Sequence, residues 1–287
     1  MTIAYEVLGV YALLAIWAIL LVVGVRTKNY WPFLGFGVAI AIYLNTGYFV
    51  RGQPDAIASF IGIYDVFDNL GLARDEGAPA LAQCADNACT VWGDRYVNHP
   101  SWGVAFYDRF LNGPDLRKNL LYAHIFFNTV AFVLLHVQLF RPGTGSYRAA
   151  HRKLGRVSFA SLTAGTVCAV WLASEHGSVS EYGGNLAMLG FFSMSAFVYG
   201  TAVQGLRTAR SGDLAAHRMW MIRYAGAMWG AFWLFRVMLV ITGPLLRNYE
   251  TVSLLISIWF SAPLGILIAE KIRLRAPERE RAPQLVS

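Results

Sequence analysis

Long apolar runs constrain this chain more than any other feature. About seven segments, each nearly free of charged residues, are long enough to cross a bilayer, which takes about 20 apolar residues in a helix. They cover residues 7–25, 30–50, 119–140, 157–174, 186–206, 219–243 and 251–270. Because lipid offers no hydrogen bonds to the backbone, runs of this length indicate helices. We therefore expect an all-α fold, a polytopic transmembrane helical bundle.

The composition excludes several other classes of protein. Hydrophobic residues make up 56% of the chain and charged residues 14%, whereas charged residues make up about 25% of an ordinary soluble domain. The mean hydropathy is +0.44. These values exclude disordered, collagen-like and coiled-coil chains, and three cysteines are too few for a disulfide scaffold. The net charge of +7 does not indicate nucleic-acid binding, because the cations follow the sides of the expected membrane.

The distribution of Lys and Arg predicts the orientation of the spans. Alternate connections and the C-terminal tail hold most of the cations: Arg26, Lys28, Arg141, Arg148, Arg152, Lys153, Arg156, Arg207, Arg210, Arg218, Arg223, Lys271, Arg273, Arg275, Arg279 and Arg281. Basic loops stay in the cytoplasm. We therefore expect a multi-pass protein of the bacterial inner (plasma) membrane, with a periplasmic N-terminus and a cytoplasmic C-terminus. The first run does not resemble a cleaved signal peptide, because no cation precedes it.

Four parts follow from this topology. Residues 1–50 hold two transmembrane helices, 51–118 a periplasmic loop, 119–245 a four-helix membrane core, and 246–287 a seventh helix and a basic cytoplasmic tail. Within the loop, apolar residues recur at helical spacing and predict amphipathic helices on the outer leaflet. Cys84 and Cys89 lie in the same loop. On the oxidising side of the membrane, we expect them to form a disulfide.

Six histidines are the most informative polar residues. The topology sorts them into an outer set, His99, His124 and His176, and an inner set, His136, His151 and His217. Ionisable residues within spans are costly and usually functional. The twelve residues between His124 and His136 correspond to about 18 Å along a helix, so one span can give a ligand to each of two stacked cofactors.

Haem iron takes axial imidazoles and fits between the helices of a bundle. The sequence therefore predicts one or two b-type haems. His124, His136, His176 and His217 are the expected iron ligands, and the choice between His151 and His217 at the inner site stays open. His99 is expected to be structural.

Arginines and glycines complete the set of candidate residues. Arg152, Arg156 and Arg223 flank the inner histidines, and we expect them near haem propionates. Arg236 lies within the sixth span, where a guanidinium needs a partner: a propionate, a lipid phosphate or an outer-loop carboxylate, unless it extends to the interface. Gly226 and Gly230 form a GxxxG pattern, for which we favour close helix packing over close approach of a flat cofactor.

Two motifs at the cytoplasmic edge carry a resemblance to a known family. They are His151-Arg152-Lys153-Leu154-Gly155-Arg156 and His217-Arg218-Met219-Trp220-Met221-Ile222-Arg223. With their surroundings, residues 119–245, they resemble the bacterial membrane family catalogued as domain of unknown function 2306, which has no firmly assigned activity. A looser likeness is to the two-haem cytochrome b superfamily, which includes ferric reductases. That likeness implies pairing of His124 with His176 outside, and of His136 with His217 or His151 inside.

Three functions remain open at this stage. The first is a membrane b-type cytochrome that transfers electrons. The second is a non-haem metal or quinone site formed by His136, His151 and His217. The third is a non-catalytic lipid- or anion-binding subunit, or an assembly or transport partner, that uses the Arg and His motifs. Because the sequence has no flavin or nicotinamide fingerprint, the expected partners are membrane lipid, a quinone and a redox subunit, and whether the protein is an enzyme stays open.

Overall fold

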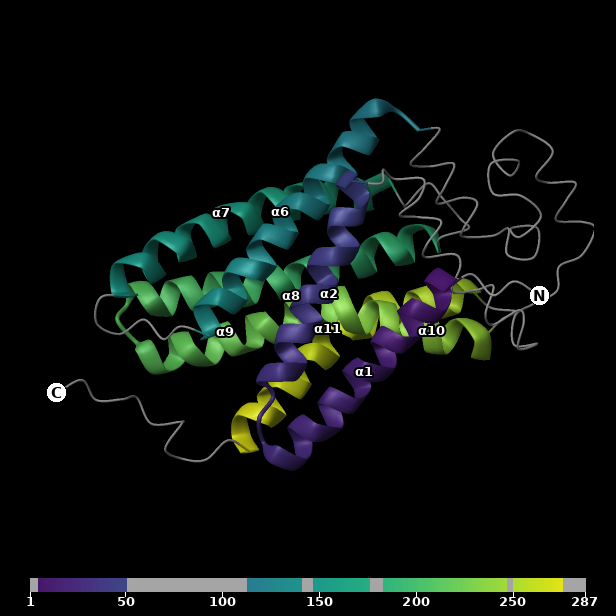
Figure 1. Ribbon diagram of the computed structural model, residues 1–287. Helices are drawn as coiled ribbons and strands as arrows, with labels where there is room; N and C mark the ends of the chain where they lie inside the picture. Colours follow the sequence, from purple (N-terminus) through teal and green to yellow (C-terminus); the bar gives the residue numbers. More distant parts are fainter. Residues whose placement is uncertain (1–4, 51–112, 141–146, 176–182, 247–249, 276–287) are drawn as a thin grey trace, which may run out of the picture. The chain divides into compact units, whose positions relative to one another are not determined.

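A computed structural model describes residues 5–50, 113–140, 147–175, 183–246 and 250–275 (Figure 1). These ranges contain helices and short connections, and no strand. The helices are α1 (Tyr5–Thr27), α2 (Trp31–Val50), α6 (Asp115–Phe140), α7 (Tyr147–Ser174), α8 (Gly184–Arg210), α9 (Leu214–Trp229), the π-helix η6 (Gly230–Leu234), α10 (Phe235–Leu245) and α11 (Glu250–Arg275). Six of the expected spans each fall on one of these helices, and the span 219–243 falls on α9, η6 and α10 together, so the all-α prediction is confirmed.

Five of the described helices, α2, α6, α7, α8 and α11, are long and apolar enough to cross a membrane. The expected sixth span forms one uninterrupted helical segment, in which the π-helix η6 lies between α9 and α10. This division leaves α9 with only 16 residues, too few to span alone. The chain is therefore a multi-pass membrane protein.

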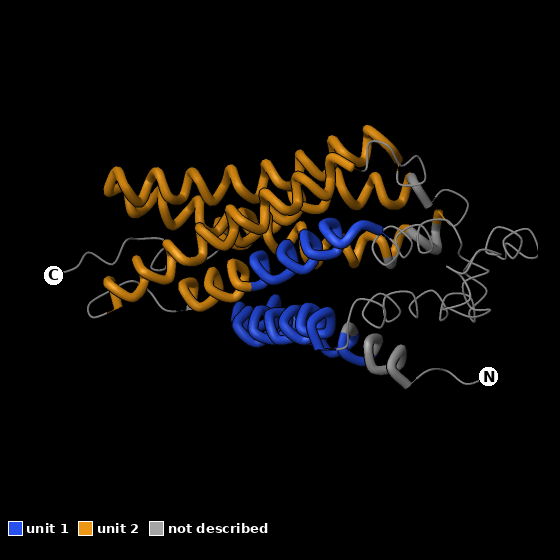
Figure 2. Tube along the Cα trace, turned by 90° about the horizontal axis from the view of Figure 1, so that it is seen from above, with its two compact units in different colours: residues 1–129 blue, residues 130–287 orange. Residues whose placement is uncertain are grey.

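The chain forms two compact units, each described here by itself (Figure 2). Unit 1, Met1–Thr129, holds α1, α2 and the first part of α6. In this unit Trp17 stacks on Phe33, with ring centroids 4.9 Å apart, and its indole nitrogen donates to the Phe33 carbonyl at 3.1 Å. The amide of Asn45 donates to the hydroxyl of Thr129 at 2.6 Å. Polar groups of these apolar helices are thus hydrogen-bonded within the unit, as the low dielectric of a bilayer requires.

Unit 2, Val130–Ser287, holds the rest of α6 and all the later helices. In this unit α8 packs against α7 and α9, and α11 packs against α8 and α9. A short turn joins α8 to α9. In it Gly212 adopts φ +79°, and the Asp213 carboxylate caps α9 by accepting from the backbone N–H of Ala216 at 2.9 Å. The turn makes α8 and α9 antiparallel neighbours.

Most described cations of unit 2 gather at one end of it, which we call the basic end. It consists of the start of α7, the end of α8, the start of α9 and the end of α11. Its cations are Arg148, Arg152, Lys153, Arg156, Arg207, Arg210, Arg218, Arg223, Lys271, Arg273 and Arg275. Among the described residues of this end, the only carboxylates are those of Asp213 and Glu270.

The closest helix contact in unit 2 is made by glycines. A Cβ atom placed on Gly226 would lie 2.5 Å from the Gly265 carbonyl oxygen and 2.7 Å from the Cβ of Ala269. A Cβ on Gly230 would collide with the carbonyl of Ser261. The prediction of close helix packing at this GxxxG pattern is therefore confirmed. The complementary surface is a stripe of small residues at every fourth position of α11: Ser253, Ser257, Ser261, Gly265 and Ala269.

We predict opposite effects of alanine at two glycines of unit 2. Gly226→Ala forces α9 away from α11 and should lower the unfolding free energy by about 1–3 kcal/mol. Gly200→Ala, in α8, is the matched control, because nothing lies within 4 Å of the added Cβ. It should be neutral or slightly stabilising, since alanine favours helix. Thermal unfolding of the purified variants in detergent measures both, and equal midpoints would contradict the packing argument.

Candidate functional site

Two histidines meet at the basic end, and we call them the histidine pair. His151 lies near the start of α7 and His217 in the first turn of α9, so the two come from helices separated by α8 in the chain. Their ring centroids are 6.3 Å apart and their planes are nearly perpendicular, at 88°. The sequence motifs contained both residues, but sequence reasoning treated them as alternatives for one inner position. The structure brings them together.

The orientation of His217 is set by a backbone group of the neighbouring helix. Its Nδ1 lies 2.8 Å from the carbonyl oxygen of Gly205 on α8. A carbonyl only accepts, so Nδ1 carries the proton and donates it, and Nε2 keeps a lone pair. Gly205 permits this approach, because a Cβ there would lie 2.8 Å from the sulfur of Met221. A hydrogen bond from one ring nitrogen to a backbone carbonyl is also what commonly orients metal-bound histidines.

His151 contributes a buried ring nitrogen that lacks a partner. Its Nδ1 is inaccessible to solvent and makes no hydrogen bond to any described residue. Two turns further along α7 and α9, on the same helix faces, lie Ser158 and Tyr224. The Tyr224 hydroxyl lies beside Ser158 without a well-formed hydrogen bond, while the Ser158 hydroxyl donates to the Ala131 carbonyl at 3.3 Å. The interface between α7 and α9 is therefore polar at its basic end and further in.

His136 plays a different part from the one expected. It is 2% exposed, and its Nδ1 donates to the Phe132 carbonyl at 2.7 Å. The indole nitrogen of Trp229 donates to its Nε2, also at 2.7 Å. Both ring nitrogens are thus engaged, so His136 connects α6 to α9 as a neutral imidazole and cannot bind iron unless Trp229 moves away.

The expected cluster of three inner histidines is not formed. Within the described ranges, no group of three or more His, Cys, Asp or Glu side chains could hold a metal ion. The structure therefore does not bring His136, His151 and His217 together as a metal-binding group, and the non-haem metal or quinone site stays a prediction. His136 is engaged instead by Phe132 and Trp229.

The outer candidates are only partly described. His124 lies in unit 1, where its Nδ1 is 3.0 Å from the side-chain amide nitrogen of Asn128. Because that amide nitrogen only donates, Nδ1 accepts and the proton of a neutral His124 lies on Nε2. His176, Cys84, Cys89 and His99 lie outside the described residues, as do the expected amphipathic helices, so the outer haem and the disulfide stay predictions.

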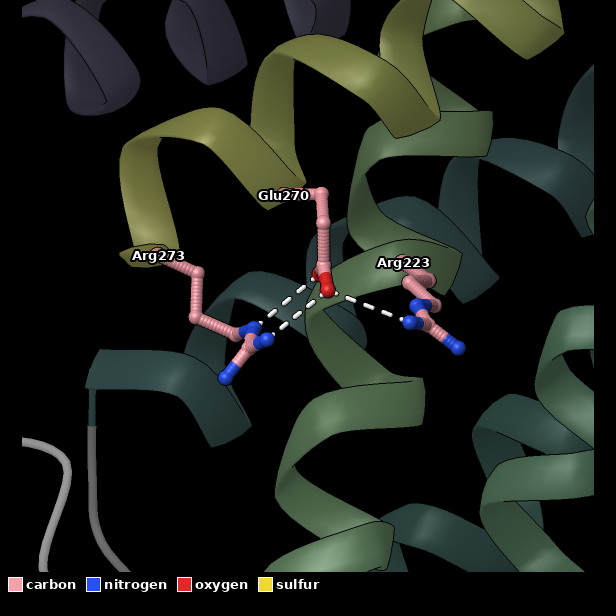
Figure 3. A network of polar contacts seen from close by, with 3 residues as sticks. All are labelled: Arg223, Glu270 and Arg273. Carbon is pink, nitrogen blue, oxygen red and sulfur yellow. Dashed lines mark hydrogen bonds and ion pairs between the residues drawn. The ribbon is translucent and has the colours of Figure 1, made fainter. Parts of the chain in front are cut away.

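Arg223 binds a carboxylate that sequence reasoning missed (Figure 3). Its Nη2 lies 3.1 Å from Oε1 of Glu270 on α11. Arg273 holds the same carboxylate through two bonds, from Nε to Oε2 at 3.0 Å and from Nη2 to Oε1 at 2.8 Å. The guanidinium of Arg223 also lies 4.7 Å from the ring centroid of Trp220. The sequence does contain one indication of this ion pair: Glu270 and Arg273 are three residues apart, a spacing that favours an ion pair on one helix face.

The remaining arginines lie elsewhere. Arg152 and Arg156 are exposed, and their positions on α7 point about 100° and about 140° away from that of His151. Arg236 lies in α10, where its Nη1 donates to the Phe232 carbonyl at 2.6 Å and its guanidinium lies 4.1 Å from the Phe232 ring centroid. Phe232 belongs to the π-helix η6. The π-helix therefore offers this cation a backbone acceptor, which is none of the partners expected from the sequence.

Trp229→Phe tests the structural role assigned to His136. The substitution keeps an aromatic ring but removes the indole N–H that His136 Nε2 accepts, and it should lower the unfolding free energy by about 1–3 kcal/mol. Trp171→Phe is the matched control, because Trp171 is 52% exposed on α7. Thermal unfolding in detergent measures both. An unchanged midpoint for Trp229→Phe would show that this hydrogen bond does not hold α6 to α9.

Comparison with known proteins gives one match. The family model described as predicted membrane protein (DUF2306) matches residues 121–270, more than half of the chain, from α6 to near the end of α11. This range contains the histidine pair, His136, Trp229 and Glu270. No curated protein and no solved structure matches the chain. The chain belongs to the DUF2306 family of predicted membrane proteins.

Proposed function

We propose that the protein is a b-type cytochrome-like electron carrier of the membrane, with a haem b held between His151 and His217. The observation that carries the proposal is the spacing of the histidine pair. A metal–imidazole bond is about 2 Å long, so two imidazoles that would hold one iron between them have ring centroids roughly 6 Å apart. The observed separation is 6.3 Å.

The chemistry of the two residues fits axial ligation. His217 presents Nε2 as a lone pair because its Nδ1–H is held by the Gly205 carbonyl. His151 has a buried ring nitrogen with no partner among the described residues, and a buried polar atom is costly unless something binds it. A bound haem would supply reversible one-electron chemistry. The helices α7, α8 and α9 would hold the two ligands rigidly and keep water from the apolar side of the site.

The expected topology predicts on which side of the membrane this site lies. The basic end would lie on the cytoplasmic side of the bacterial inner membrane, so the haem would receive electrons at that surface from a quinol or from a partner redox subunit. The outer pair, His124 with His176, would hold a second haem if the electrons cross the membrane. The described geometry favours the inner site because its two imidazoles already meet.

An absorbance spectrum of the detergent-purified protein tests the proposal. Expressed with ample haem, the protein should show a Soret band that sharpens on reduction with dithionite, with about one haem per chain if only the inner site binds. His217→Ala and His151→Ala each remove an axial ligand and should abolish the low-spin spectrum of that haem. The haem content of the purified variants, measured after extraction, gives the stoichiometry.

His124→Ala is the control for these variants, because His124 lies in unit 1, away from the histidine pair in the chain. It should keep the inner haem. A content of two haems, of which His124→Ala removes one, would establish the outer site as well. A colourless protein, or a His217→Ala variant with an unchanged spectrum, would rule out the inner haem.

A further inference from the structure

The lipid-facing side of α7 carries a feature that the proposed function does not use. Arg152, Arg156 and Ala160 follow at intervals of four residues, and Val167 and Trp171 continue the same line along the helix. All five are exposed, Val167 by 63% and Trp171 by 52%. On the opposite face lie His151, Ser158 and Leu162, which pack inside unit 2. A line of exposed apolar residues in a membrane helix faces lipid, and here it ends in two arginines.

The depth of these arginines matches the level of phospholipid phosphates. From Arg156 to the end of α7 at Ser174 there are 18 residues, or about 27 Å along the helix. The hydrocarbon core of a bilayer is about 30 Å thick. When Ser174 lies at one interface, Arg156 therefore lies close to the other. Arg152, one turn further out, lies among the headgroups.

No carboxylate of the described residues pairs with the two guanidinium groups. Within the described ranges, the ion pairs join Lys118 to Asp115, and Glu270 to both Arg223 and Arg273. Asp213, the other described carboxylate of the basic end, caps α9. Among the described residues, the charges of Arg152 and Arg156 are therefore available to an anionic ligand at the exposed face of α7.

We propose that Arg152 and Arg156 bind the phosphate-bearing headgroup of an anionic phospholipid, with an acyl chain lying along Ala160 and Val167. Guanidinium groups one helical turn apart can donate to the same phosphate through paired N–H bonds. A diacyl lipid fits better than a free anion, because the apolar line begins one turn from Arg156 and runs straight into the membrane. The site is independent of the haem.

The test uses the full-length protein in a mild non-ionic detergent. Phosphatidylglycerol, phosphatidylcholine or inorganic phosphate is added, and the thermal unfolding midpoint is followed by tryptophan fluorescence. A ligand that binds only the folded state raises the midpoint. Phosphatidylglycerol should raise it clearly, phosphatidylcholine little, and inorganic phosphate not at all. An equal rise with phosphatidylcholine would indicate a response to acyl chains, and an equal rise with inorganic phosphate a free-anion site; either would overturn the proposal.

Two double variants of equal charge locate the site. Arg152→Gln with Arg156→Gln should weaken phosphatidylglycerol binding by roughly thirty-fold, since two headgroup contacts are lost, and should remove most of the rise in the midpoint. Arg210→Gln with Arg218→Gln removes the same charge from exposed positions of the basic end. The residues one turn from them toward the middle of each helix, Leu206 and Ile222, are only partly exposed, so no exposed apolar line follows either arginine into the helix. This control should keep the rise, and an equal loss in both variants would show a diffuse effect of the basic end rather than a site on α7.

Discussion

The contact between α9 and α11 is the interaction on which the described core of unit 2 depends. Gly226 of α9 and Gly230 of η6 bring the backbone against Gly265 and Ser261 of α11, closer than any side chain would allow. Small residues make such contacts possible in membranes, where dispersion forces and hydrogen bonds replace the hydrophobic effect between helices. The contact also brings Arg223 within reach of Glu270, so the ion pair adds a polar restraint near the end of the same interface. Since α9 carries His217 as well, a helix outside the predicted four-helix core sets the position of a candidate ligand.

The three described histidines of unit 2 differ in the hydrogen-bond partners of their ring nitrogens. In a low-dielectric interior an unpaired polar atom is costly, so the partners of a buried histidine indicate its role. In His136 one ring nitrogen is bonded to the Phe132 carbonyl and the other to the Trp229 indole. Both nitrogens thus have a hydrogen-bond partner, as expected of a structural residue. His217 has one nitrogen held by Gly205 and His151 has one left without a partner. Burial alone does not separate these roles, because the most buried of the three, His136, is the structural one.

The helices could be predicted from the sequence because each is a local pattern, about 20 apolar residues long. The partners of the polar residues could not. His136 meets Trp229 across 93 residues of sequence and Arg223 meets Glu270 across 47, and such contacts depend on the rotation and depth of two helices at once. The motifs identified His151 and His217 correctly as neighbours of the basic edge. Hydropathy does not show that α8 places α9 beside α7. The contact between the two histidines could therefore not be predicted from it.

The motif from His151 to Arg156 illustrates how one short sequence serves two surfaces. Successive residues of a helix point about 100° apart, so the ring of His151 meets that of His217 inside unit 2 while its neighbour Arg152 is exposed. Arg156 repeats the direction of Arg152 one turn later, and Ser158 repeats that of His151 two turns later. A motif of this kind therefore does not specify one site. The imidazole and the guanidinium groups lie on different sides of α7, so the proposed redox and lipid-binding roles can be tested by separate substitutions even though their residues are adjacent in sequence.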